Sequence, residues 1–262
     1  HEMSKRLGNE LAYTEGKSRE DWLRQTIEET RKKDPTLPTY DEWKKMGLYR
    51  VNKEPVVALE DFRNDPEANK LDTPSGKIEI YSERLEAMAK EWKFGKFHPV
   101  WEGDKLTSIP EYTETWEGPI EARQSEKYPL QCIGHHYKAR THSSYGNVDW
   151  LKEAHRQQVW LSNIDAEERG IKNGDQVFVY NDRGTLRLEA KVTERIMPGV
   201  ISVPQGAWYD PRPTSEVKPP QDANQDKGVD VAGSVNTLTS LHPTPLAKGH
   251  TGHTTLAQVV KA

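Results

Sequence analysis

The sequence predicts a mainly β protein with α/β character, in which a closed β-barrel follows a segment of mixed helices and strands. Residues 1–52 show helical spacing of apolar residues together with helix start signals. From Tyr128 onward, short apolar runs alternate with turn residues at intervals of about 8–12 residues, which is typical of barrels. We therefore expect two domains, residues 1–127 and residues 128–262.

The first helix of the N-terminal part has a clear start signal. Ser18–Asp21 resembles a capping box with aspartate in the last place, and apolar residues from Trp22 to Ile27 follow it at helical spacing. Pro35 ends this helix, because the residue before a proline avoids the helical conformation. A second short helix is expected to start after Thr39.

The rest of the first part combines a turn, a strand and a helix. Residues 74–76 predict a turn, and Lys77–Tyr81 alternates apolar and polar residues as a strand does. Ser82 is expected to cap a helix whose apolar face extends to Trp92. Residues 94–127 lack periodicity and predict a connecting loop.

The second part is expected to hold the barrel strands. Each predicted strand is a short apolar or alternating run bounded by Gly, Pro, Asn or Asp. A one-turn helix at 165–169 and a long exposed loop at 209–228 interrupt them. The expected strands are 130–133, 159–161, 177–180, 186–192, 200–203, 235–238 and 256–260.

Composition excludes several classes of protein. The formal net charge is −4, which argues against a protein that coats nucleic acid, and no apolar stretch approaches the ~18 residues of a membrane span. The single cysteine, Cys132, excludes an internal disulfide, a cysteine-ligated zinc and a cysteine-bound iron–sulfur cluster within these residues. The start of the sequence has no basic-then-apolar leader, so we expect a signal peptide to be absent or already removed.

Two histidine-rich segments are the strongest candidates for a functional site. Seven of the nine histidines lie at or beyond His135, and most of them fall in residues 134–147 and 242–254. Each segment follows an apolar run and combines imidazoles, hydroxyls, a basic residue and glycines. Such loops suit a phosphorylated or heteroaromatic ligand, because backbone amides and basic side chains neutralise phosphate where glycine allows close approach.

Other site chemistries have weaker support. His250 and His253 could pair on a metal, but no acidic residue accompanies them. The sequence has no G-x-S-x-G elbow around Ser143, no G-x-G-x-x-G and no Walker A motif. Polar surface loops without a ligand also remain open. We assign no catalytic residue and no metal ligand.

The order of motifs resembles the molybdopterin oxidoreductases of the dimethyl sulfoxide reductase family. The likeness is greatest to the catalytic subunits of the three-subunit, membrane-associated reductases. It covers nearly the whole chain. The motifs are Asp65–Asn69, Thr73–Ile80, His136–Asn147, Asn181–Gly184, Met197–Val200, Gln205–Asp210, Val235–Leu238 and Pro245–Gly249.

The resemblance implies a particular fold and a position within a longer subunit. Residues 128–262 would form the family's double-psi β-barrel, the molybdopterin dinucleotide-binding domain. Residues 1–127 would be the C-terminal part of a core domain plus the connecting loop. The family's cysteine motif for a 4Fe-4S cluster and its serine ligand to molybdenum lie further upstream and are not matched here. The chain would therefore be a C-terminal portion.

The resemblance also implies the ligand and its site. The ligand would be bis-molybdopterin guanine dinucleotide with molybdenum. We further expect Arg140, His142 and Ser143 to line one concave surface with Asn236, Gly252 and His253. The residues carried over are Gly134, His135, His136, Tyr137, Arg140, His142, Ser143, Ser144, Asn236, Gly252 and His253.

The implied activity of the whole subunit is reduction of S-oxides or N-oxides, such as dimethyl sulfoxide or trimethylamine N-oxide, in anaerobic respiration. The implied partners are the rest of the catalytic subunit, an iron–sulfur electron-transfer subunit and a membrane-anchor subunit, with no nucleic acid. The implied location is the periplasm or the outer face of the cytoplasmic membrane. The portion alone is expected to be inactive. The alternative is a stand-alone molybdopterin-binding module without redox activity, and selenate or another oxyanion remains open as substrate.

Overall fold

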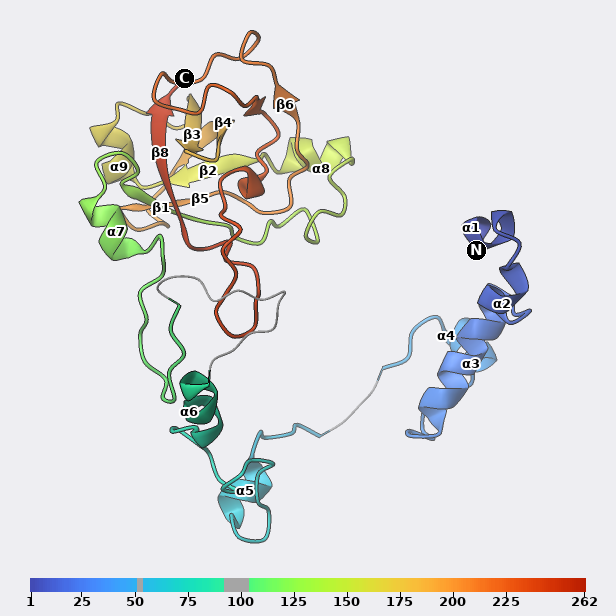
Figure 1. The fold of residues 1–262 in the computed structure, drawn as a ribbon. Coiled ribbons are helices and arrows are strands. Elements are labelled where there is room, and N and C mark those ends of the chain that lie inside the picture. The colour runs from blue at the N-terminus through green and yellow to red at the C-terminus, as the bar shows by residue number, and fades with distance from the viewer. Residues whose placement is uncertain (51–53, 92–103) are drawn as a thin grey trace. The chain divides into compact units, whose positions relative to one another are not determined.

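The computed structural model describes residues 1–50, 54–91 and 104–262 (Figure 1). The chain divides into two compact units, His1–Lys77 and Ile78–Ala262. Within the described ranges, no helix is long and apolar enough to cross a membrane. The sequence-based domain limits, 1–127 and 128–262, stay predictions.

The first unit is made of short helices: α1 (Glu2–Arg6), α2 (Glu10–Thr14), α3 (Arg19–Arg31), α4 (Tyr40–Met46) and α5 (Glu60–Asn64). The predicted capping box of α3 is confirmed, because Ser18 Oγ accepts from the Asp21 amide while the Asp21 carboxylate accepts from the Ser18 amide. Helix α4 starts after Thr39 as predicted, with a second capping box formed with Glu42. Both helices therefore start where local sequence fixes them.

The predicted strand at Lys77–Tyr81 is wrong. These residues form bends and irregular structure, and Ile78 and Ile80 are 63% and 74% exposed. An alternating pattern yields a strand only when a neighbouring strand takes its backbone hydrogen bonds. In the described part of the chain, no strand pairs with these residues.

Along the chain, two helices follow this segment before the first barrel strand. Helix α6 (Glu83–Lys90) confirms the prediction that Ser82 caps a helix, since Ser82 Oγ accepts from the Leu85 amide. Trp92 lies outside the described residues. The predicted loop at 94–127 is interrupted by α7 (Pro119–Gln124), which begins with proline at its first position. Residues 94–103 of that loop also lie outside the described residues.

Six strands of the second unit close into a barrel within the described residues (Figure 1). Their order is β2-β5-β1-β8-β3-β4, and β4 pairs back with β2. The β1–β5 and β2–β4 pairs are parallel, and the other pairs of the ring are antiparallel. This is the predicted double-psi barrel. The strands are β1 (Leu130–Ile133), β2 (Gln158–Leu161), β3 (Gln176–Asn181), β4 (Gly184–Val192), β5 (Val200–Ser202) and β8 (Thr255–Lys261).

Two short strands extend the barrel beyond the predicted pattern. Strand β7 (Val229–Asp230) pairs in parallel with β4, and β6 (Pro211–Arg212) pairs with β7. The predicted strand at 235–238 is wrong, because Val235–Thr237 forms the 3-10 helix η1. Apolar Val235 and Leu238 are three residues apart, so the same pattern fits one face of a 3-10 turn.

Helix α8 (Asp149–Ala154) precedes β2 and was not predicted, whereas α9 (Asn163–Glu168) corresponds to the expected one-turn helix. Ser162 caps α9, and Asp165 Oδ2 accepts from both Ser162 Oγ and the Gly199 amide. This carboxylate therefore joins α9 to the turn before β5.

The barrel encloses a continuous apolar core. Burial of each large aliphatic side chain is worth about 1.5–3 kcal/mol, so this cluster dominates the stability of the unit. The core comprises Leu130, Cys132, Val159, Leu161, Ala166, Ile171, Val177, Val179, Leu186, Leu188, Ala190, Ile201, Val203, Val235, Leu238, Ala257 and Val259.

Candidate functional site

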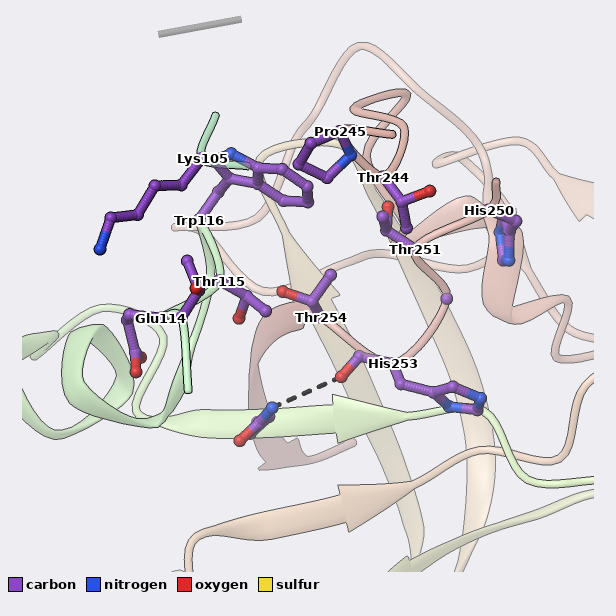
Figure 2. Close-up of a pocket in the computed structure, with 13 residues that line it drawn as sticks. Lys105, Glu114, Thr115, Trp116, Thr244, Pro245, His250, Thr251, His253 and Thr254 are labelled. Carbon is purple, nitrogen blue, oxygen red and sulfur yellow. Dashed lines mark hydrogen bonds between the residues drawn. The ribbon is translucent and has the colours of Figure 1, made fainter. Parts of the chain in front are cut away.

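The two histidine-rich segments meet at Gly134, directly after β1. The Gly134 amide donates to His253 Nδ1 at 3.3 Å, and a Cβ at Gly134 would lie 3.5 Å from the Gly252 carbonyl oxygen. Gln131 Nε2 also donates to the His253 carbonyl oxygen at 3.4 Å, as Figure 2 shows. Residues more than a hundred positions apart are thus brought together by pairing of β1 with β8.

Arg140 is the best-anchored cation of the first segment. Its Nη2 donates to Gln157 Oε1 at 2.7 Å and to the Gln205 carbonyl oxygen at 3.1 Å. The guanidinium carbon lies 4.1 Å from the centroid of the Tyr137 ring, within cation–π distance. Two hydrogen bonds and an aromatic face therefore fix the orientation of this charge.

Arg140 and its neighbour Tyr137 each have a buried polar atom that finds no hydrogen-bond partner in the described ranges. Among the described residues, neither Arg140 Nε nor the Tyr137 hydroxyl makes a hydrogen bond. Burial lowers the pKa of Arg140 and raises the pKa of Tyr137. The Arg140 charge offsets part of the shift at Tyr137. An unsatisfied buried donor costs about 1–3 kcal/mol, so a polar ligand that bonded to this pair would offset that cost.

Arg140 and Tyr137 line a hollow of about 480 Å³. Its wall also contains Trp208, Tyr209 and Asp210. Trp208 Nε1 donates to the Ser143 carbonyl oxygen at 2.8 Å, which ties the histidine-rich segment to residues 205–210.

Gly206 allows the first segment to approach this wall. Its φ of +84° lies in the left-handed region, and a Cβ there would collide with the His142 carbonyl oxygen. His142 and Tyr145 themselves have positive φ values of 52° and 70°. Such conformations cost free energy and cluster at ligand sites.

The predicted side chains of the first segment fall into two groups. His135 is partly buried, with Nδ1 at 2.5 Å from Ser202 Oγ and its ring beside Trp160. Burial lowers the pKa of His135, and the Lys191 and Arg140 charges lower it further. The exposed group presents its donors to solvent, and it comprises His136, His142, Ser143 and Ser144.

The remaining predicted residues, Asn236, Gly252 and His253, line two other hollows. Asn236 lines one of about 590 Å³ that also contains Arg183, Lys227 and Thr237. Gly252 and His253 line one of about 390 Å³ that Trp116 also borders (Figure 2).

The shared concave surface for Arg140, His142 and Ser143 with Asn236, Gly252 and His253 therefore stays a prediction: the two segments meet at Gly134, while Arg140, Asn236 and His253 line separate hollows. Successive residues of a 3-10 turn point about 120° apart. Val235 is buried toward Gly134, so Asn236 is turned to another wall.

Some residues around the site were not assigned a role from the sequence. Trp116 stacks on His242 at 3.5 Å between ring centroids, and the His242 Nε2 lies 3.1 Å from Asp104 Oδ1. Gln157 precedes β2 and contacts Arg140. Trp208 belongs to the motif Gln205–Asp210, which could have identified it.

The donor set fits a molybdopterin dinucleotide. A fixed guanidinium, exposed imidazoles and hydroxyls, and an unpartnered Arg140 Nε and Tyr137 hydroxyl suit phosphate and pterin edges. Within the part of the chain that the structure describes, no group of three or more His, Cys, Asp or Glu side chains could hold a metal ion.

Comparison with known proteins defines the class. The family described as "Molydopterin dinucleotide binding domain" matches residues 130–256. The fold is similar to that of acetylene hydratase from Pelobacter acetylenicus, with a TM-score of 0.58 over 87% of this chain and 28% of that one, at 21% identity. Residues 130–256 are thus a molybdopterin dinucleotide-binding domain in a double-psi barrel.

Curated relatives define the family. The chain is 46% identical to dimethyl sulfoxide reductase DmsA and 48% identical to the putative dimethyl sulfoxide reductase chain YnfE, both of Escherichia coli K12. It is 32% identical to a dimethyl sulfoxide/trimethylamine N-oxide reductase of Cereibacter sphaeroides. Each match covers 99% of this chain but only 30% of the relative's length. The chain belongs to the dimethyl sulfoxide reductase family of molybdoenzymes and corresponds to a C-terminal part of such an enzyme.

Proposed function

We propose that this chain is the cofactor-binding portion of a catalytic subunit that reduces S-oxides or N-oxides and holds bis-molybdopterin guanine dinucleotide. The observation that carries the proposal is a pair of buried polar atoms beside the hollow, Arg140 Nε and the Tyr137 hydroxyl, which make no hydrogen bond to any described residue. The names of the relatives, which are dimethyl sulfoxide and trimethylamine N-oxide reductases, support the substrate class.

Each predicted residue has a role in this proposal. Arg140 neutralises a phosphate or pterin oxygen of the cofactor. The ring of Tyr137 lies against the guanidinium, and its hydroxyl donates a hydrogen bond to the cofactor. The exposed imidazoles and hydroxyls of residues 136–144 supply further hydrogen bonds, and Asn236, Gly252 and His253 act from the second segment. The two-electron redox chemistry at molybdenum is supplied by the cofactor when it is bound.

The proposed partners lie outside this chain. Its only cysteine, Cys132, is buried in the barrel core, so the ligands of a 4Fe-4S cluster come from the rest of the catalytic subunit. In the proposed complex, an iron–sulfur subunit delivers electrons and a membrane-anchor subunit holds the enzyme at the outer face of the cytoplasmic membrane for anaerobic respiration.

The test is the cofactor content of the full-length subunit. Arg140→Ala removes a charge-assisted contact, so cofactor affinity falls about 10- to 150-fold, measured as molybdenum and guanine nucleotide per subunit. Arg140→Lys restores only part, because an ammonium lacks the planar fork. Arg195→Ala, at an exposed position outside the hollow, is the matched control and leaves the content unchanged. Normal content in Arg140→Ala contradicts the proposal.

A second measurement concerns the isolated chain. Purified residues 1–262 do not reduce dimethyl sulfoxide with a viologen dye as electron donor, because the chain lacks the family's cluster and metal-ligand motifs. Activity above a heat-denatured control contradicts this part of the proposal.

A further inference from the structure

Gln157 joins three segments that are far apart in the sequence. Its Nε2 donates to the Pro204 carbonyl oxygen at 2.7 Å and to the Gly233 carbonyl oxygen at 2.9 Å. Its Oε1 accepts from Arg140 Nη2 at 2.7 Å. The amide therefore uses both of its N–H donors on backbone and its oxygen on the guanidinium.

The packing around Gln157 leaves it little freedom. Gly233 has φ of +84°, and a Cβ there would lie 2.8 Å from Gln157 Cγ and 2.7 Å from Leu188 Cδ2. The backbone at residue 233 therefore lies so close to the glutamine side chain that only glycine, which has no Cβ, fits there. Because η1 with Asn236 begins two residues after Gly233, Gln157 also holds the chain directly before η1.

The orientation of Arg140 depends on the same contacts. Both hydrogen bonds of the guanidinium use Nη2, one to Gln157 and one to the Gln205 carbonyl oxygen. The Gln205 amide in turn donates to the His135 carbonyl oxygen at 2.9 Å. The two bonds of Nη2 fix the plane of the guanidinium and with it the direction of its Nε–H. Among the described residues, this Nε–H has no partner.

We propose that Gln157 is a positioning residue for the molybdopterin cofactor, because it holds the Arg140 guanidinium in the wall of the hollow where the ligand would lie. The inference rests on the proposed function, since it assigns the ligand of Arg140 to that cofactor. A neutral amide suits the role. A glutamate would set a carboxylate against two carbonyl oxygens and would neutralise the charge that Arg140 offers to a phosphate.

The test compares two variants with a neighbouring control in the full-length subunit. Gln157→Leu removes all three hydrogen bonds, and Gln157→Glu keeps the shape but changes the charge. Both lower cofactor affinity about 10-fold, measured as molybdenum and guanine nucleotide per subunit. Gln158→Leu is the matched control, because Gln158 donates to Glu189 at 2.6 Å and does not contact Arg140. It leaves the cofactor content unchanged.

A double variant separates positioning from a general loss of stability. In an Arg140→Ala background, Gln157→Leu lowers cofactor affinity by less than about 2-fold, because its effect passes through the missing guanidinium. An equal, additive loss in both backgrounds overturns the inference and indicates a structural role. Loss of cofactor in Arg140→Ala with normal content in both Gln157 variants overturns the inference alone. Normal content in Arg140→Ala overturns the proposed function and this inference together.

Discussion

The barrel and the N-terminal unit obtain their structure from different sources. In the barrel, long-range strand pairing surrounds a core in which large aliphatic side chains are fully buried. Among the described residues of His1–Lys77, by contrast, no hydrophobic side chain is buried. Helices α3 and α4 of that unit are held by capping boxes and by exposed ion pairs such as Arg24–Asp41 at 2.6 Å.

The difference explains where a cofactor site can be built. Exposed ion pairs contribute about 0–1 kcal/mol each, so local contacts alone leave helices free to fray. A ligand site needs side chains held in fixed positions by surrounding structure. Arg140 meets that condition because its partners, Gln157 and Gln205, lie in segments flanking barrel strands β2 and β5.

The largest difference between the two regions is expected in thiol alkylation. Burial raises the pKa of the Cys132 thiol to about 12, and the side chain lies in the barrel core. In the 262-residue chain, alkylation at pH 8 therefore requires opening of the barrel and is slowed at least about 1,000-fold relative to the urea-unfolded chain. Mass spectrometry of the time course measures the rate.

The matching probe for the N-terminal unit is Thr30→Cys in a Cys132→Ala background, at an exposed position of α3. This thiol reacts at close to the unfolded rate. If the two thiols react equally fast in the folded chain, the contrast between the regions is wrong.

Truncation of apolar side chains gives the next largest effect. Leu161 is 0% exposed, so Leu161→Ala lowers the free energy of unfolding of the barrel by about 2–5 kcal/mol. Leu23, on α3, is 46% exposed, and Leu23→Ala changes the free energy of unfolding of the first unit by less than about 0.5 kcal/mol. Urea unfolding followed by circular dichroism measures both, and a Leu23→Ala cost as large as that of Leu161→Ala would give the first unit a core of its own.

The smallest contrast compares two helix caps of the same chemistry. Ser18 caps α3 at an exposed position, so Ser18→Ala weakens that helix by about 1 kcal/mol and leaves barrel amides unaffected. Ser162 is buried and its partner Asp165 also binds the Gly199 amide. Ser162→Ala therefore costs more and accelerates amide exchange across the barrel. Native-state hydrogen exchange distinguishes the two, and equal, purely local effects would count against this reading.

The sequence predicted the barrel better than its surroundings. Strands such as Val177–Tyr180 and Leu186–Val192 were found because alternation and turn residues agree with the tertiary structure there. The alternation at Lys77–Tyr81 and the short run Val235–Leu238 gave wrong strands, because strand pairing depends on neighbours that a local pattern does not reveal. Helix α8 was missed because its six residues carry no amphipathic signal.

The candidate site was predicted in part for a similar reason. Arg140 and Tyr137 stood out through the density of donors in one segment and the family resemblance. Gln157 and the close approach of Gly206 to His142 arise only when distant segments meet. The division of Arg140, Asn236 and His253 among three hollows likewise depends on packing that local sequence does not encode.

The central claim is that the segment after β1 binds the molybdopterin cofactor through Arg140. The most direct measurement is an experimental structure of the full-length subunit with its cofactor bound. We predict a phosphate or pterin oxygen within about 2.7–3.2 Å of Arg140 Nε, with Nη2 still bonded to Gln157. A cofactor that leaves Arg140 Nε without a contact, in an otherwise unchanged barrel, would contradict the claim.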